Sequence, residues 1–473
     1  MLHTNELLLL YRDYGRYVDS SGDEMTTMTG NALNQNQSNR DLIILSNGPG
    51  ELATWVYPTL CALAEEMTDW AIPLRVSVVL SPCSNASGQE AEIAARFPLV
   101  SRVLPAQNFM DFLLWGKTTQ GITVNEAGQT NHSSGQWDWY PKGVVLFLGG
   151  DQFYPLVIGK RLGYSTVIYA EWEARWWRWA DRFAVRNQTV ADRIPSQFAP
   201  KVSVIGDLMV DTPRTDAPVM SEPDLVPEPT ITLLPGSKGM KLRLGVPLFL
   251  GVADELAHRL PNAKFRFALA PTVSLTQLLD FARPGEAMVK VGGTTATLIE
   301  LPNQRPVLRT PQGTMVELFQ EFPAHDVYRQ SAVCVTTAGA NTAELAALHV
   351  PMVMVMPTNI ADAMQAWDGL VGLMIRLPVV GNLLVRLVNY LAARAVQREG
   401  RLLAWPNIWA KREIVPEMVQ VVVPADIAAV VMDLLADPAR LRQIKQDLRE
   451  VCGETGAARK LVAIVKGLMD KSD

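Results

Sequence analysis

One local pattern, a short apolar run followed by a glycine-containing turn, occurs twice in this sequence and restricts the folds that the chain can adopt. Residues 42–45 form a short apolar run that leads into the glycine-containing turn 46–51, and residues 231–234 lead in the same way into 235–238. A helical pattern follows each turn. Short apolar runs bounded by turns are typical of strands buried on both faces of a parallel sheet. Because a strand, a Gly-rich turn and a helix open a doubly wound α/β domain, the sequence predicts two Rossmann-like α/β domains facing a cleft.

The same reasoning places the remaining elements. Further strands are predicted at residues 76–80, 103–104, 144–148, 166–170, 183–185, 202–205, 265–270, 333–336 and 352–356. Helices are predicted at residues 90–96, 155–162, 246–260, 457–469 and in a stretch that ends near 348. Residues 117–140 are polar and indicate an insertion with some β-structure. Alternating strands and helices do not by themselves separate one paired Rossmann-like fold from another.

Composition shifts suggest the domain boundaries. Residues 1–40 are predicted to be a disordered tail, because 26–40 are rich in Asn, Gln, Ser and Gly, and Met25 or Met28 is an alternative start. Four prolines between 213 and 227 predict an interdomain linker at 216–229. The expected first domain is then 41–215 and the second is 230–450, with an amphipathic insertion at 362–401. A C-terminal helix within 451–473 is expected to pack across the domains.

Composition also excludes several classes of protein. The chain has 473 residues, of which 48% are hydrophobic and 19% charged, so two globular domains with large cores are expected. A net charge of −5 argues against a general nucleic-acid binder. The four cysteines form no C-x-x-C pair and the five histidines no H-x-x-x-H pair, so no metal site is expected. No signal peptide or membrane-spanning run is recognised, and a cytoplasmic location is expected.

Two loops of the second half are candidates for binding a diphosphate. Residues 337–344 join a strand to a helix start, where free N–H groups and the helix dipole favour an anion. Gly339 lies in this turn, and Glu344 lies one turn inside the helix, where it is placed to accept from ribose hydroxyls. Lys238 follows the strand 231–234 and offers a cation. The alternatives are an ordinary tight turn and a solvent-exposed lysine.

Polar residues after the strands of the first half are candidates for the acceptor side. Asp151 follows the strand 144–148, where a carboxylate suits abstraction of a hydroxyl proton; the alternative is a helix N-cap for 155–162. Gly50 and Glu51 follow the first strand, and the segment 171–180 contains Glu171, Trp172 and three further tryptophans. Core packing is the alternative for the tryptophans.

Residues 403–420 are rich in polar side chains. Their predicted layout is a loop, a short helix and the start of a second helix after Pro416. Polar side chains set among apolar neighbours often line a cleft, and the alternative is a surface helix with solvated charges. The candidates for this role are Asn407, Arg412, Glu413 and Gln420.

The insertion at 362–401 is predicted to touch an anionic membrane surface. From residue 381 onward, a helical spacing of four places arginines and Tyr390 on one stripe, with leucine, valine and alanine opposite. Such a helix fits a membrane interface; the alternative is packing on its own domain. The predicted membrane-contact residues are Arg376, Leu384, Arg386, Val388, Leu391 and Arg394.

Several of these motifs resemble those of lipid-A-disaccharide synthases. The run at 406–420 reads PN-x-x-A-x-REIVPE-x-x-Q, as in that family. Residues 233–238 resemble its LLPGSR loop with Lys238 in place of arginine, and Gly339 and Glu344 match its S-G-T-A-x-x-E turn. Asp151 matches the second aspartate of D-A-P-D-F, and Gly50 and Glu51 stand where the family shows GEASGD. The resemblance covers about 41–425.

The resemblance implies a glycosyltransferase of the GT-B fold that acts as an inverting hexosyltransferase. A sugar would pass from a UDP-sugar donor to a lipid-linked sugar acceptor, on the inner face of a membrane and without metal or cofactor. Asp151 would be the base; Lys238, Gly339, Glu344, Asn407, Arg412, Glu413 and Gln420 would bind the donor; Gly50, Glu51, Glu171 and Trp172 would lie on the acceptor side. A sugar-nucleotide epimerase and a non-catalytic nucleotide-sugar or lipid-binding relative are the alternatives, and the oligomeric state stays open.

Overall fold

The computed structural model describes most of the chain between residues 39 and 470. The described ranges are 39–67, 73–83, 88–125, 127–211, 228–237, 239–271, 273–300, 304–358 and 402–470, with the single residues 70, 86 and 302. Arg40–Asp473 forms one compact unit. The predicted tail up to residue 38, most of the predicted linker and the whole insertion 362–401 lie outside the described residues. Lys238 and the six predicted membrane-contact residues lie outside them as well.

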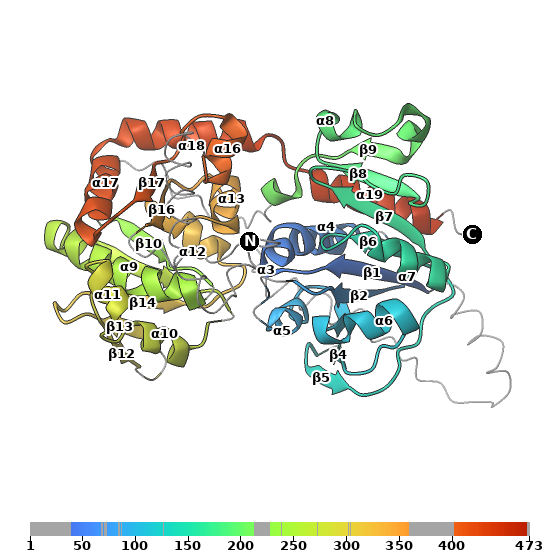
Figure 1. Ribbon diagram of the computed structural model, residues 1–473, viewed down its shortest axis with the longest axis horizontal. Helices are drawn as coiled ribbons and strands as arrows, with labels where there is room; N and C mark the ends of the chain where they lie inside the picture. Colours follow the sequence, from blue (N-terminus) through green and yellow to red (C-terminus); the bar gives the residue numbers. More distant parts are fainter. Residues whose placement is uncertain are drawn as a thin grey trace, which may run out of the picture. The chain divides into compact units, whose positions relative to one another are not determined.

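The first sheet has nine strands in the described part of the chain, in the order β5-β4-β3-β2-β1-β6-β7-β8-β9 (Figure 1). Its strands are β1 Arg40–Ser46, β2 Leu74–Leu80, β3 Val100–Leu104, β4 Gly121–Val124, β5 Thr130–Ser133, β6 Gly143–Phe147, β7 Ser165–Ala170, β8 Arg182–Val185 and β9 Val202–Val204. All pairs are parallel except β3–β4 and β4–β5. The parallel core β3-β2-β1-β6-β7-β8 has the Rossmann strand order.

Helices cover both faces of this sheet. They are α3 Pro49–Glu51, η1 Leu52–Val56, α4 Tyr57–Glu66, α5 Glu90–Ala94, η3 Ala106–Asn108, α6 Phe109–Trp115, α7 Tyr154–Leu162, α8 Gln188–Ala191, η4 Ser196–Lys201, η5 Leu208–Val210 and the C-terminal α19 Ala457–Asp470. One core cluster holds α4, α5 and α19, and another holds α6 and α7 (Figure 1). The C-terminal helix therefore returns to pack on the first sheet, through Leu461 and Val465.

The second sheet has eight strands among the described residues, in the order β12-β13-β14-β11-β10-β15-β16-β17. They are β10 Thr230–Leu234, β11 Lys264–Ala268, β12 Thr297–Ile299, β13 Val307–Arg309, β14 Met315–Phe319, β15 Val333–Thr337, β16 Met352–Pro357 and β17 Glu417–Gln420. Their helices are α9 Gly239–Arg259, α10 Leu275–Phe281, α11 Glu286–Lys290, α12 His325–Arg329, α13 Ala340–Ala347, α16 Trp405–Ala410, α17 Pro424–Ala436 and α18 Pro438–Cys452. The core β14-β11-β10-β15-β16-β17 repeats the Rossmann order, so the prediction of two Rossmann-like α/β domains is confirmed.

Two predicted elements differ from the structure. The helix predicted after Pro416 is wrong, because Glu417–Gln420 is a strand that pairs with β16 at the edge of the second sheet. Proline is tolerated directly before an edge strand, where its missing N–H breaks no ladder. The helix predicted at 246–260 begins earlier, at Gly239, and holds Pro247 in its interior. The insertion 117–140 contains the hairpin β4–β5, as predicted.

Candidate functional site

Each Rossmann-like domain has a switch point, where the strand order reverses and ligands of this fold bind. In the first domain it lies between β1 and β6, and in the second between β10 and β15. A Cβ placed on Gly149 would lie 2.6 Å from Asn47 Oδ1, so the loops after β6 and β1 touch. A Cβ placed on Gly50 would lie 3.5 Å from the Cβ of Ala340. The loop after β1 therefore lies near the start of α13, and a side chain at position 50 would make ordinary van der Waals contact there.

The second switch point combines a helix start with a lysine that the sequence analysis missed. Gly339 has a φ of 149°, which favours glycine, and directly precedes α13. Lys241 lies in the first turn of α9 and donates from Nζ to the carbonyl oxygen of Ala338, 2.5 Å away. A cation is disfavoured in a helix's first turn unless an anion is nearby. The signal for Lys241 was present in the sequence, because it follows Lys238 by three residues.

Glu344 and Asn407 are held by the protein itself. Glu344 Oε1 lies 3.1 Å from Nε2 of His325, a buried partner that nothing in the local sequence pointed to. Asn407 is fully buried, and its Oδ1 accepts from the N–H groups of Ile414 and Val415. Its Nδ2 donates to Val415 O and to Glu417 Oε1. Because an amide side chain has two donors and two acceptor sites, Asn407 has no capacity left for a ligand.

The other predicted donor residues of 403–420 do not form one cluster. Arg412 pairs with Asp447 of α18 across 3.1 Å. Burial, followed by the charge of Glu417, raises the pKa of Glu413, whereas Gln420 is exposed at the end of β17. Glu417 itself accepts from the backbone N–H groups of 403 and 404. The polar density of this segment therefore serves in large part to fix its own turn.

Asp151 lies at the surface beside the first switch point. Its Oδ1 accepts from the N–H of Phe153, and its Oδ2 lies 3.3 Å from Nη2 of Arg175. The side chain is 43% exposed. The alternative of a helix N-cap is wrong, since Phe153 occupies the N-cap position of α7 and no side chain caps it. Instead, the side chain of Asp151 closes a tight turn by accepting from the N–H of Phe153.

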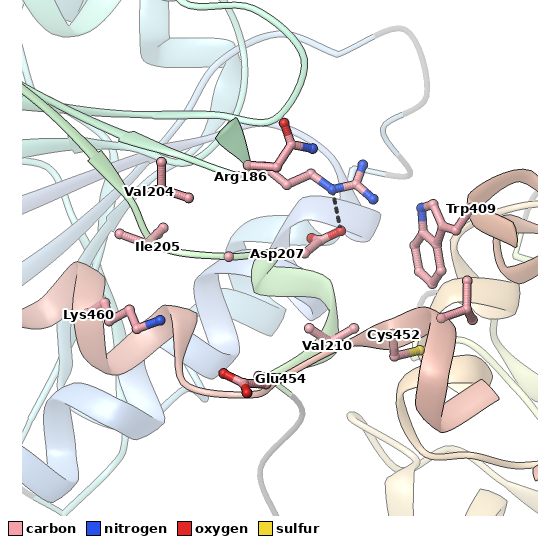
Figure 2. A pocket seen from close by; sticks show the side chains of 13 residues that line it. Arg186, Val204, Ile205, Asp207, Val210, Trp409, Cys452, Glu454 and Lys460 are labelled. Carbon is pink, nitrogen blue, oxygen red and sulfur yellow. Dashed lines mark ion pairs between the residues drawn. The ribbon is translucent and has the colours of Figure 1, made fainter. Parts of the chain in front are cut away.

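A buried ion cluster follows the next strands of the same sheet. Arg186, after β8, lies 2.9 Å from Asp207 through its Nε and 3.6 Å from Glu171, after β7, through its Nη1 (Figure 2 shows the pair with Asp207). Glu171 and Asp207 are each 10% exposed. Sequence reasoning found Glu171 but missed Arg186 and Asp207. Arg186 directly follows a strand end, which is the signal that had selected Asp151.

The environment of Glu171 disfavours its charge. Burial, followed by the negative charge of Asp207, raises the pKa of Glu171 to about 7, and Arg186 offsets part of the increase. Glu51, after β1, is also close enough to raise it. Among the described residues, Oε1 of Glu171 has no hydrogen-bond partner. A buried carboxyl whose pKa is raised toward neutral pH is a candidate acid–base group.

Tryptophans and Arg186 join the two domains beside this cluster. Trp172 stacks on Trp405 with ring centroids 6.2 Å apart, and Trp405 lies 6.0 Å from Trp409. The guanidinium of Arg186 lies over the rings of Trp172 and Trp409, at 5.2 and 5.7 Å. A cavity of about 390 Å³ opens next to it and is lined in part by Asp207, Trp409, Cys452 and Lys460 (Figure 2). In the described part of the chain, no group of three or more His, Cys, Asp or Glu side chains could hold a metal ion.

The chain is similar in sequence to a curated protein and in structure to several solved ones. No family model matches the chain. The chain is 26% identical over 245 residues to a lipid-A-disaccharide synthase from Synechocystis sp., a match that covers 50% of this chain and 48% of that protein. It thus spans about half the length of the curated relative. Similar solved structures include the UDP-GlcNAc 2-epimerase of Methanocaldococcus jannaschii in complex with UDP-GlcNAc and UDP, with 10% identity, 90% of this chain and 99% of that chain covered, and a TM-score of 0.39.

A second solved structure is the ADP-heptose lps heptosyltransferase II of E. coli, with 12% identity, 67% of this chain and 85% of that chain covered, and a TM-score of 0.31. The strand orders of the two sheets define the fold class here: an α/β protein with two Rossmann-like domains facing a cleft, of the GT-B type. Across one half of its length, the chain is similar in sequence to a glycosyltransferase.

Proposed function

We propose that this chain is a glycosyltransferase that transfers a sugar from a UDP-sugar to a lipid-linked sugar acceptor. The observation that carries the proposal is the pairing of the two switch points. Gly339, the start of α13 and Lys241 offer a diphosphate site in the second domain, and Gly50 of the first domain lies near it. Free N–H groups at a helix start and a lysine cation suit a diphosphate. The match to a lipid-A-disaccharide synthase supports the acceptor class.

In the proposed reaction, an acceptor hydroxyl attacks the anomeric carbon of the donor from the side opposite the diphosphate. The bond to the diphosphate breaks, and UDP leaves with its electron pair, so the configuration inverts. Lys241 and the N–H groups at the start of α13, with Lys238, stabilise the charge that develops on the diphosphate. The resemblance assigns the proton acceptor to Asp151. No metal or cofactor is part of this scheme.

Calorimetric titration of UDP tests the donor site. We expect the wild type to bind UDP and Lys241→Ala to lose about 1.5–3 kcal/mol of binding free energy, since a charged phosphate contact is removed. Lys160→Ala removes an exposed lysine of α7 and serves as the matched control. A wild type that does not bind UDP, or equal affinities for the two variants, contradicts the donor assignment.

The buried carboxylates also favour a second candidate, a sugar-nucleotide epimerase. Asp207 and Glu51 lie close enough to Glu171 to raise its pKa, and acid–base chemistry on a sugar carbon needs such carboxyl groups. The two reactions differ in their need for an acceptor. Incubation with UDP-N-acetylglucosamine alone yields an isomerised sugar nucleotide if the chain is an epimerase. For a transferase we expect UDP release only after a membrane-lipid extract is added.

Membrane attachment is part of the proposal. The predicted anchor at 362–401 lies outside the described residues, but helix α6 presents a second apolar surface. Met110, Leu114 and Trp115 are 47%, 55% and 72% exposed, and the first two share one helix face. Exposed apolar patches of this kind mark interaction sites, and tryptophan favours the membrane interface. None of the helices in the described ranges is long and apolar enough to span a membrane.

A further inference from the structure

Two carboxylates of the first domain compete for the role of general base, and their surroundings differ. Asp151 is 43% exposed, and both of its oxygens are engaged, one by the N–H of Phe153 and one by Arg175. Glu171 is 10% exposed, and among the described residues its Oε1 accepts no hydrogen bond. Nη1 of Arg186 lies 3.6 Å from this oxygen, an ion pair beyond hydrogen-bond distance, so Oε1 keeps the capacity to accept a hydrogen bond. A substrate hydroxyl is the natural donor to such an oxygen.

The position of Glu171 in the fold supports this reading. Glu171 directly follows β7, which pairs with β6, and it therefore lies at the carboxyl edge of the first sheet. The next residue, Trp172, stacks on Trp405 of the second domain, so Glu171 lies beside the junction of the two domains. Aromatic rings that are partly exposed at such a junction offer an apolar face to a sugar ring. The carboxyl thus lies where an acceptor sugar would meet the donor domain.

Charged groups from every neighbouring element set the proton affinity of Glu171. Burial raises its pKa most, and Asp207 at the start of η5 raises it as well; Arg186 after β8 and a hydrogen bond from the Trp172 side chain lower it, and Glu51 of α3 raises it. Tyr169 of β7 faces the same cluster, and burial keeps its own pKa well above the ordinary value. The resulting pKa of about 7 matches the operating pH that favours general acid–base catalysis.

We infer that Glu171, rather than Asp151, takes the proton from the acceptor hydroxyl, with Arg186 as its positioning residue; this inference rests on the proposed transferase function. The hydroxyl oxygen forms the new bond to the anomeric carbon, and its proton passes to Oε1 of Glu171. The bond from the anomeric carbon to the diphosphate breaks, and its electron pair leaves with UDP. Glu171 then releases the proton to water, so every atom and charge is accounted for.

The test compares three variants in the same UDP-release assay, with UDP-N-acetylglucosamine and a membrane-lipid extract as probes. Glu171→Gln keeps the size of the protonated side chain but cannot take a proton. We expect its turnover to fall about 10²–10⁴-fold, with unchanged UDP affinity by calorimetry. Glu173→Gln is the matched control, because Glu173 is an exposed neighbour paired with Arg175, and its turnover should stay within a few-fold of the wild type. Asp151→Asn tests the rival base.

A second measurement separates a base from a merely structural carboxyl. Because the folded-state pKa of Glu171 is raised, its protonated form favours folding at low pH, and this contribution is lost as pH rises through about 7. We therefore expect Glu171→Gln to melt at a higher temperature than the wild type at pH 8 and at the same temperature at pH 4.5. A variant that melts lower at both pH values while losing activity overturns the assignment in favour of a structural role.

The outcomes distinguish this inference from the function on which it rests. A wild type without turnover overturns the proposed transferase, and the inference falls with it. An active wild type whose Glu171→Gln variant retains full turnover overturns the inference alone. A loss found in Asp151→Asn while Glu171→Gln stays at the wild-type level returns the role of base to Asp151.

Discussion

Substitution of Asn407 by alanine tests whether the polar segment 403–420 builds the site or touches the donor. Asn407 lies in α16 and is fully buried. Its Oδ1 accepts from the N–H groups of Ile414 and Val415 at 2.7 and 2.9 Å, and its Nδ2 donates at 2.8 and 2.7 Å to Val415 O and Glu417 Oε1. The substitution removes all four hydrogen bonds without changing the course of the chain.

The magnitude follows from the partners left behind. Each buried N–H group without an acceptor costs about 1–3 kcal/mol, so the two N–H groups of Ile414 and Val415 together cost about 2–6 kcal/mol. Glu417 loses less, since it still accepts from the backbone N–H groups of 403 and 404. We therefore expect the free energy of unfolding to fall by about 4 kcal/mol, which is large for a single substitution.

Urea unfolding followed by circular dichroism measures this loss. Asn125→Ala is the matched control: Asn125 also makes hydrogen bonds in a turn, to the N–H groups of Ala127 and Gln129 and to the Gln129 side chain, but it is exposed. Because water replaces those bonds, its loss should stay within about 1 kcal/mol. If Asn407→Ala unfolds like Asn125→Ala but binds UDP more weakly, Asn407 contacts the donor and the structural reasoning is refuted.

Three further predictions concern other parts of the chain. Asp41→Asn should lower the free energy of unfolding by about 3–5 kcal/mol, because it removes the fully buried carboxylate that lies 2.7 Å from Arg75 and 3.6 Å from Arg102 and leaves both cations with the exposed Asp138; a loss below about 1 kcal/mol would contradict this. Burial raises the pKa of Cys452 to about 12, so its alkylation rate by iodoacetamide, followed by peptide mass spectrometry, should rise about tenfold per pH unit between pH 8 and 10; a plateau in that range would refute the shift. Replacement of Leu114 and Trp115 by serine should reduce co-sedimentation with anionic vesicles, and unchanged sedimentation of a well-folded variant would exclude α6 as a contact.

The double Rossmann-like fold was predictable because its central strands are buried on both faces. Such strands appear in sequence as uninterrupted apolar runs, and all seven residues of β1 are buried. The edge strand β17 was not predictable in this way. Of its four residues, Glu-Met-Val-Gln, only Met418 is buried, and they follow a proline, so only the pairing with β16 identifies them as a strand.

In the candidate site as well, features set by consecutive residues were predicted, and contacts between residues distant in sequence were not. The turn at Gly339 was predicted because a glycine, a strand end and a helix start lie within a few consecutive residues. The cluster at Arg186 was missed because its partners are distant in sequence. Arg186 forms an ion pair with Asp207, which lies 21 residues later in the sequence, and Trp172 stacks on Trp405 of the other domain. Isolated charges in loops give no sign in the sequence of which partner they will meet.

Hydrogen-bonding capacity separates the two kinds of buried polar residue in this site. Asn407 uses all four of its hydrogen-bonding positions within the protein, whereas Oε1 of Glu171 uses none among the described residues. A satisfied buried group stabilises the fold, and an unsatisfied one lowers stability until a ligand completes it. The two substitutions should therefore have opposite signs at pH 8: Asn407→Ala lowers the melting temperature, and Glu171→Gln raises it. If both lower it by similar amounts, Glu171 is a structural partner of Arg186, and residual hydrogen-bonding capacity does not identify the catalytic carboxyl in this fold.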